Sequence, residues 1–130
     1  MISRISGIAA LLGLFTIALG AFGAHSLKDK LDPQELLNFE TGVRYMMYHV
    51  LGILLVNNSS FLNMRTKHSV SILFLIGILF FSGSLFAIST SFIAAKQIWF
   101  ITPLGGLLFI LGWLITAVGF FKRNTENISN

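Results

Sequence analysis

ISGIAALLGLFTIALGAFGA, at residues 5–24, contains no charged residue and is long enough to cross the hydrocarbon core of a bilayer, which is about 30 Å thick. Further runs that are mainly apolar follow at 36–56, 69–88 and 98–121 and fill most of the 130-residue chain. Hydrophobic residues make up 55% of the sequence and charged residues only 11%, whereas a soluble domain is about a quarter charged. The sequence therefore predicts an all-α, polytopic membrane protein, with residues 1–130 forming one transmembrane domain, an antiparallel bundle of four transmembrane helices.

A helix-start signature precedes the second run. Asp32 is a suitable N-cap, Pro33 suits the first helical position, and Glu35 is placed to bond back to the cap in a capping box. Leu31 and Leu36 flank this signature as a hydrophobic staple. We therefore expect the second helix to begin here and to continue to about residue 56.

Lysine and arginine are distributed unevenly between the two expected ends of the bundle. One end should carry Arg4, Arg65, Lys67, Lys122 and Arg123, with Arg65, Lys67 and His68 in a short loop, and the other end Lys28, Lys30 and Lys96. Because cytoplasmic segments carry the excess of positive charge, we expect both termini in the cytoplasm of a multi-pass protein of the cell (inner) membrane. The opposite orientation would exchange every inside and outside position.

Small residues recur along three of the runs at the spacing of a helix–helix seam. They are Ser6, Ala9, Gly13, Thr16, Gly20 and Gly23 in the first run, Gly77, Ser84 and Ser91 in the third, and Thr102, Gly105, Gly112, Thr116 and Gly119 in the fourth, where Phe109 is the one large residue in register. Small residues allow membrane helices to approach closely, so we predict packing seams within the chain; an oligomer interface is the alternative.

The second run is unusual because polar and ionisable residues lie inside it. Glu40, Thr41, Arg44, Tyr45, Tyr48 and His49 occupy one broad arc of the predicted helix, and Val43, Met46, Met47, Val50, Ile53 and Leu54 occupy the remainder. We expect the second set to face lipid. Glu40 precedes Arg44 by four residues, the favourable order for an ion pair. If these residues only hold the helices together, His49 should be neutral and bonded to Tyr45 or to a backbone carbonyl of a neighbouring helix.

The expected depths bring these residues into one polar layer in the extracytoplasmic half of the bundle. The candidate site consists of His25, Glu40, Arg44, Tyr45, Tyr48, His49, Ser84 and Thr102. Ionisable residues inside a membrane are costly and are candidates for a functional site, but they also stabilise packing between helices. We expect no metal site, because His25 and His49 differ in depth by more than about 10 Å, and the chain contains no cysteine.

Several longer strings occur in order along the chain: GAFGAHSL at 20–27, FETGVRYMMYH at 39–49, FSGSL at 81–85, and TPLGG at 102–106 followed by Gly112 and Trp113. In these strings the chain resembles the YwdK/YgdD-like family of small bacterial membrane proteins. The resemblance implies a four-span inner-membrane protein of unassigned activity, and it supplies no substrate, cofactor or catalytic residue. Met46 stands where many members have glutamine.

Three functional hypotheses follow from the sequence. The first is a structural or associative membrane protein, and the second is a small transporter or ligand-binding protein that uses the layer around Glu40, Arg44 and His49. The third, a lipid- or quinone-directed enzyme with His49 or His25 as acid or base, lacks a nucleophile and base at a recognisable spacing. We therefore expect a non-enzymatic protein without cofactors. Its expected partners are membrane lipids and either a second copy or another membrane protein, and not nucleic acid.

Overall fold

The computed structural model describes residues 1–128, apart from the side chains of Ala95 and of residues 123–128. Its elements are helical: α1 (Ile2–Phe22), a π-helical turn η1 (Gly23–Leu27), α2 (Pro33–Asn58), α3 (Met64–Ser89), a short α4 (Ala95–Ile98) and α5 (Ile101–Ile128). The segments Ile2–Leu27, Met64–Ser89 and Ile101–Lys122 are each long and apolar enough to cross a membrane. The prediction of an all-α membrane protein is confirmed at this level.

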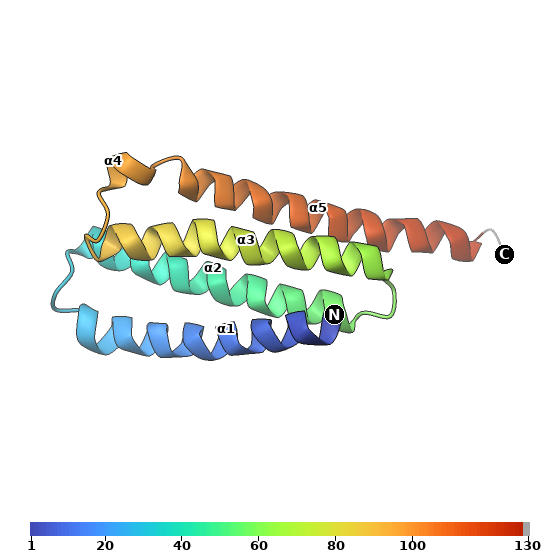
Figure 1. Cartoon of the computed structure of the whole chain (residues 1–130), viewed down its shortest axis with the longest axis horizontal. Helices are drawn as coiled ribbons and strands as arrows, with labels where there is room; N and C mark the ends of the chain where they lie inside the picture. Colours follow the sequence, from blue (N-terminus) through green and yellow to red (C-terminus); the bar gives the residue numbers. More distant parts are fainter. Residues whose placement is uncertain (129–130) are drawn as a thin grey trace.

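The four long helices lie side by side, and helices that follow one another in the sequence run in opposite directions (Figure 1). Helix α2 packs against α1 and α3, and α3 also packs against α5. The start of α1, the α2–α3 connection and the end of α5 lie at one end of the molecule, and the α1–η1–α2 and α3–α4–α5 connections lie at the other (Figure 1). Helices α2 and α3 are therefore the central pair, with α1 and α5 outside them.

The stripe of small residues on α1 packs against α2. Ala9 and Thr16 are fully buried, and a Cβ atom at Gly13 would lie 3.4 Å from Cγ1 of Val50. This close approach of two backbones is the expected role of small residues in membrane helices. The predicted intramolecular seam is confirmed for this helix.

The stripe on α5 packs against α3 even more closely. A Cβ atom at Gly105 would overlap the backbone nitrogen of Phe81, and one at Gly77 on α3 would lie 2.5 Å from Cε1 of Phe109. Phe109, the one large residue in the stripe, is itself buried and fits against Gly77. Ser91 does not belong to the α3 stripe, because α3 ends at Ser89 and Ser91 lies in the following turn with φ 55°.

The predicted lipid face of α2 is wrong. Met46, Val50 and Ile53 are buried, with Ile53 fully inaccessible, and the side chains of Val50 and Val43 lie opposite glycines of α1. The apolar arc is needed to fill the seams with α1 and α3. The charged residues of the predicted polar arc lie on the exposed side of the helix instead.

The first residues of α2 and α3 test two predictions made from local sequence signals, a capping box before α2 and a basic loop before α3. The capping box is present: Asp32 Oδ1 accepts from the N–H of Glu35 at 2.8 Å, and Glu35 Oε2 accepts from the N–H of Asp32 at 3.0 Å. The predicted loop over 65–68 is wrong, because Asn63 caps α3 by accepting from the N–H of Thr66 at 2.8 Å. The helix therefore begins at Met64, and the basic residues lie on its first turns.

A candidate polar site on helix α2

His49 is the buried centre of the polar residues on α2, with 4% of its surface exposed. Its Nδ1 lies 2.7 Å from the backbone oxygen of Tyr45, and its Nε2 lies 3.1 Å from the indole Nε1 of Trp113 on α5. An indole N–H can only donate, so Nε2 must accept. Nδ1 therefore carries the hydrogen and donates to Tyr45, and the ring is a neutral imidazole with both nitrogens bonded.

Aromatic rings from α3 and α5 enclose this imidazole. The ring of Phe109 stacks on it with centroids 3.4 Å apart and an interplanar angle of 7°, and Phe74 contacts it edge-on at 4.9 Å. Phe74 also packs against Trp113 at 5.2 Å. His49 thus links α2 to α5 through a hydrogen bond and a ring stack, which supports the prediction that it contributes to packing.

Glu40 and Arg44 point the other way. Both are exposed, and Arg44 Nη2 donates to Thr41 Oγ1 on its own helix at 3.2 Å. The predicted ion pair between Glu40 and Arg44 is not present in the described part of the chain, although the two residues are four apart. The carboxylate and the guanidinium are therefore presented separately on one exposed side of α2.

The other predicted site residues lie in separate places: Ser84, Thr102 and His25 near one end of the molecule, and the two tyrosines near the middle of α2. Ser84 and Thr102 share a hydrogen bond of 2.6 Å between α3 and α5, with Ser84 also donating to the backbone oxygen of Phe81. His25 is exposed in η1. Tyr45 and Tyr48 are both exposed to a large degree, with ring centroids 5.8 Å apart. The structure does not gather the eight residues into one site.

A groove lies beside His49, between α2, α3 and α5. Its volume is about 720 Å³, and its lining is mainly aromatic and aliphatic. The lining residues are Tyr45, Tyr48, His49, Phe81, Gly106, Phe109, Ile110 and Trp113. With few polar atoms on its surface, the groove suits an apolar chain or ring better than an ion.

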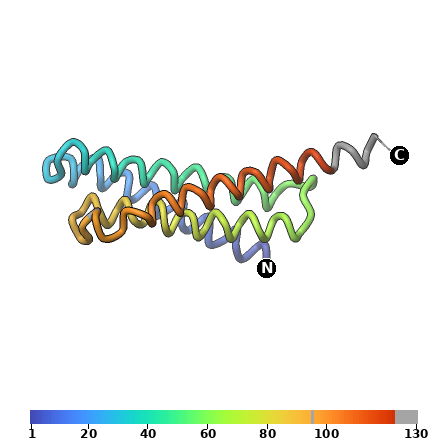
Figure 2. Tube along the Cα trace, turned by 90° about the horizontal axis from the view of Figure 1, so that it is seen from above, coloured from blue at the N-terminus to red at the C-terminus, as the bar shows by residue number. Residues whose placement is uncertain are grey.

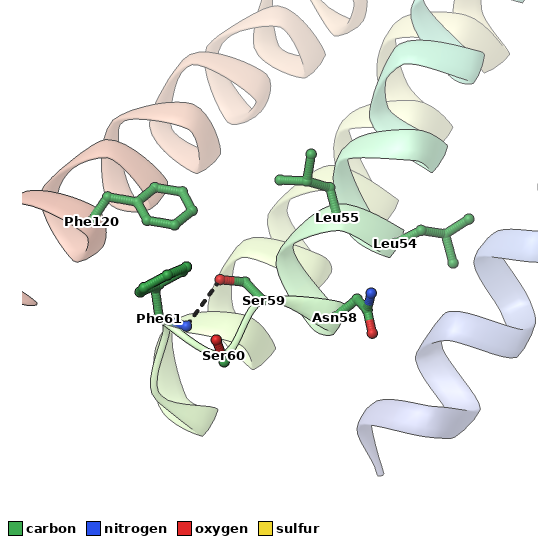
Figure 3. Close-up of a pocket in the computed structure, with 7 residues that line it drawn as sticks. All are labelled: Leu54, Leu55, Asn58, Ser59, Ser60, Phe61 and Phe120. Carbon is green, nitrogen blue, oxygen red and sulfur yellow. Dashed lines mark hydrogen bonds between the residues drawn. The ribbon is translucent and has the colours of Figure 1, made fainter.

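A second groove, of about 690 Å³, lies at the opposite end of α2 (Figure 3). It is formed by Leu54 and Leu55, the connection from Asn58 to Phe61, and Phe120 of α5. The ring of Phe61 faces that of Phe120 with centroids 6.5 Å apart, and the Phe61 N–H donates to Ser59 Oγ at 3.2 Å (Figure 3). This groove contains none of the predicted site residues.

Sequence reasoning missed a polar cluster around Asn57, which is 8% exposed. Its Nδ2 donates to Ser6 Oγ at 3.1 Å, its Oδ1 accepts from Ser71 Oγ at 3.0 Å, and its backbone oxygen accepts from Lys67 Nζ at 3.1 Å. The cluster joins α1, α2 and α3. The only sequence signal for it was the polar run 57–60, which was interpreted as a helix stop.

The hydrogen bond between Trp113 and His49 was not predicted from the sequence. A tryptophan near the middle of a predicted membrane helix was the available signal, because its N–H needs an acceptor there. The chain contains two tryptophans, and the other, Trp99, is 70% exposed in the α4–α5 connection.

The sequence matches one protein family model. Residues 19–106 match the family described as "Protein of unknown function (DUF423)". This match spans η1, α2, α3 and α4 with the residues around His49, and it leaves most of α1 and α5 outside.

Individual relatives cover most of the chain. It is 43% identical over 118 residues to a "UPF0382 membrane protein" of Haemophilus influenzae, which covers 91% of this chain and 94% of that protein. It is 38% identical to "UPF0382 membrane protein YwdK" of Bacillus subtilis (88% and 94% covered) and 33% identical to "UPF0382 inner membrane protein YgdD" of Escherichia coli (94% and 92%). No solved structure matches. The resemblance read from the sequence strings is confirmed, and these names state a location without an activity.

Proposed function

Because the chain belongs to the membrane-protein family described as "Protein of unknown function (DUF423)", we propose that it is an associative four-span protein whose helix α2 is covered by another membrane helix. The family membership makes it an integral membrane protein of unassigned biochemical role. Three further statements are our proposal: α2 is covered by another membrane helix, α2 is the fourth membrane span, and both termini lie in the cytoplasm.

The fourth span is α2, although it is less apolar than α1, α3 and α5. It has 26 residues, hence a length of about 39 Å, and it packs between α1 and α3. A helix held between two membrane-crossing helices must cross the membrane with them. The protein is then a four-span antiparallel bundle.

The observation that carries the association is the exposure of Glu40 and Arg44 on this helix without an ion pair. Arg44 is 11 residues after Pro33 and so roughly 16 Å along the axis, well inside the bilayer. An ionisable residue near the bilayer centre costs about 2.5–3.5 kcal/mol on insertion scales. A protein helix that covers this side of α2 and pairs both charges would remove most of that penalty.

The orientation places both termini in the cytoplasm. Arg4, Arg65, Lys67 and Lys122 lie at the end of the molecule that holds the start of α1 and the α2–α3 connection, whereas the other end has three basic residues, Lys28, Lys30 and Lys96 (Figure 1). The membrane of residence is the cell (inner) membrane, as named for the Escherichia coli relative. We propose no catalytic activity, because His49, the buried ionisable side chain of the described part, has both nitrogens engaged.

Spin labelling in native membranes tests the association, because the chain has no cysteine and accepts single labels. Leu51→Cys places a nitroxide on the exposed side of α2, and Ile72→Cys on α3 is the control at a similar distance from the same end. Leu51 is 55% and Ile72 38% exposed in the single chain, so an uncovered Leu51 should be the more accessible to oxygen. Because a partner helix covers Leu51, we expect the label at residue 51 to be less accessible to oxygen than the label at residue 72. A label at residue 51 that is the more accessible of the two would reject the association.

The groove beside His49 favours a second candidate function, the binding of one apolar lipid chain or ring. Ile110, 64% exposed on α5, lines the groove, and Ile110→Trp would fill part of it. Native mass spectrometry should then show one retained lipid per wild-type chain under detergent conditions that strip the variant. Equal lipid loss from both proteins would reject this function.

A further inference from the structure

The exposed side of α2 has the residue spacing of a helix–helix seam. Leu37, Thr41, Arg44, Tyr48, Leu51 and Leu55 follow one another in alternating steps of four and three residues, and we call them the outer face of α2. Such spacing keeps side chains in register along two helices that wind around each other. Leu37, Tyr48, Leu51 and Leu55 are 49–58% exposed, so the remaining helices of the chain do not cover this face.

The first half of this face lies at an edge of the molecule. In the view of Figure 2, the N-terminal half of α2 forms one edge of the helix group and α3 forms the opposite edge. A partner helix can therefore approach α2 from outside without displacing α1 or α5. The residues concerned include Glu40, which flanks the outer face next to Thr41.

The two charges of this region lie on the exposed side of the helix, about one turn apart. Side chains on a helix lean toward its N-terminus, and the guanidinium of Arg44 does so, donating to Thr41 Oγ1 at 3.2 Å. The shorter side chain of Glu40 leans the same way, and the two groups are not paired with each other in the described part of the chain. The long arginine side chain can therefore reach a carboxylate that lies one turn nearer the N-terminus on a neighbouring helix.

We propose that the outer face of α2 is the interface with a second copy of this chain, in a twofold dimer in which Arg44 pairs with the partner's Glu40. Copies inserted in the same orientation are related by an axis along the membrane normal, so their α2 helices run parallel and equal residues lie at equal depth. Each guanidinium then meets the opposite carboxylate, and the dimer contains two reciprocal pairs. This inference rests on the proposed association and names its partner.

A second copy satisfies both charges with groups that lie at matching depths. A lipid phosphate would neutralise Arg44 but would leave Glu40 without a partner, and a zwitterionic headgroup would have to bring both its phosphate and its ammonium group to these two positions below the membrane surface. A different protein would have to present its own acid and base in the matching order. The second copy does so by symmetry, and its Tyr48, Leu51 and Leu55 continue the contact toward the other end of the helix.

Disulfide trapping of the purified, full-length protein in liposomes tests the dimer. Cysteine in the Leu51→Cys variant faces its own copy across the axis, whereas cysteine in Ile72→Cys lies on α3 and away from the interface. We expect a cross-linked dimer with the first variant, in a yield that falls as lipid is added, and little with the second. Equal yields would mean random collision and would overturn the proposal.

Charge reversal in the Leu51→Cys background tests the pairing. Glu40→Arg alone and Arg44→Glu alone each place like charges opposite one another, and we expect each to lower the cross-linked fraction by at least about tenfold. Mixing the two variants restores two opposite-charge pairs, so the mixture should form heterodimers. Failure of the mixture to recover, with circular dichroism showing both variants helical, would overturn the proposal.

Neutral variants serve where a reversal variant fails to insert. Glu40→Gln and Arg44→Gln should weaken the dimer to a similar degree, because each removes one member of both pairs. An effect of Arg44→Gln without one of Glu40→Gln would indicate a lipid phosphate at Arg44 and overturn the dimer. If the Leu51 label is covered in native membranes but the purified protein does not cross-link, the association holds and the partner is another protein. If the label at residue 51 is accessible in native membranes and the purified protein does not cross-link, the association and the dimer both fail.

Discussion

The residues that join the helices are single polar side chains in apolar surroundings. His49 uses both ring nitrogens, one within α2 and one to Trp113 on α5, while Asn57 uses its amide to bridge two other helices. In lipid, where the hydrophobic effect contributes little to helix association, such bonds and close packing hold helices together. Their removal should therefore be measurable one residue at a time.

Trp113→Phe keeps an aromatic ring at this position but removes the donor to His49 Nε2 and shortens the ring system. The imidazole nitrogen is then left unpaired in an aromatic cluster, and we expect a loss of about 1 kcal/mol in the free energy of unfolding. Unfolding in mixed micelles, followed by far-ultraviolet circular dichroism, measures the loss. Trp99→Phe is the matched control, because Trp99 is 70% exposed, and an equal loss in both variants would contradict the role given to the bond.

Asn57→Ala removes the side chain that bonds Ser6 of α1 and Ser71 of α3. We expect it to lower the free energy of unfolding by about 1–2 kcal/mol, because the buried hydroxyl of Ser71 and the partly buried hydroxyl of Ser6 also lose a partner. Asn58→Ala, at the exposed neighbouring position, should change it by less than about 0.5 kcal/mol. The same titration compares the two, and indistinguishable midpoints would show that the cluster does not stabilise the fold.

The identities of the important residues on α2 could be predicted from the sequence, but their directions could not. In water the apolar side of a helix faces inward, whereas a membrane helix can turn apolar residues toward lipid or toward protein. Val43 and Val50 could have faced either way from their chemistry alone, and Gly20 and Gly13 of α1 make room for them at the helix contact. His49 was expected to bond Tyr45 or a backbone carbonyl of a neighbouring helix. It bonds Tyr45, through the backbone oxygen on its own helix, and its second bond, to Trp113, was not predicted because that contact joins residues 64 positions apart.

At the scale of the helices, small residues set how closely two axes approach, and the effect differs from one glycine to the next. Gly77 of α3 lies under the ring of Phe109, which in turn is stacked on His49 and has no room to retreat. Gly83, on the same helix, has nothing within 4 Å of where a Cβ atom would be. The two positions therefore form a matched pair.

Gly77→Ala should destabilise the protein by about 1–3 kcal/mol, the usual range for overpacking a close contact. Gly83→Ala should leave stability unchanged or raise it, because alanine favours the helix over glycine. Thermal unfolding in one detergent, with both variants measured beside the wild type, decides between these outcomes. A similar loss for both would mean that the α3–α5 seam is not the reason for glycine at 77.

Helix boundaries were predictable where the signal was local and complete. The α2 start was found because Asp32, Pro33 and Glu35 specify a capping box within four residues. The α3 start was missed because Asn63 caps it alone, and the basic residues after the cap were taken for a loop. The fourth predicted span began too early, since α4 ends at Ile98 and α5 begins at Ile101.

At the scale of the whole molecule, the order of the helices follows from their short connections, and their insertion follows from charge. Helices that follow one another run in opposite directions, so the α1–η1–α2 and α3–α4–α5 connections lie at one end and the α2–α3 connection lies at the other (Figure 1). The end with Arg4, Arg65, Lys67 and Lys122 is the more basic in the described part, since the other end has three lysines. Nothing in the packing of the helices distinguishes the two insertions, because a membrane-normal inversion leaves every internal contact intact.

Single cysteines in this cysteine-free chain should therefore report the orientation directly. Ser3→Cys and Asn58→Cys lie at the basic end, and Asp29→Cys and Phe92→Cys lie in the exposed connections at the other. In intact cells of a host with one membrane, or in spheroplasts, an impermeant maleimide should label the second pair only, because the proposed orientation places the basic end in the cytoplasm. A permeant maleimide, which should label all four, is the control for reactivity. Labelling of the first pair alone would mean that the orientation is the reverse of the proposed one. Labelling of one cysteine from each pair would mean that not all four helices cross the membrane, and α2 would then not be the fourth span.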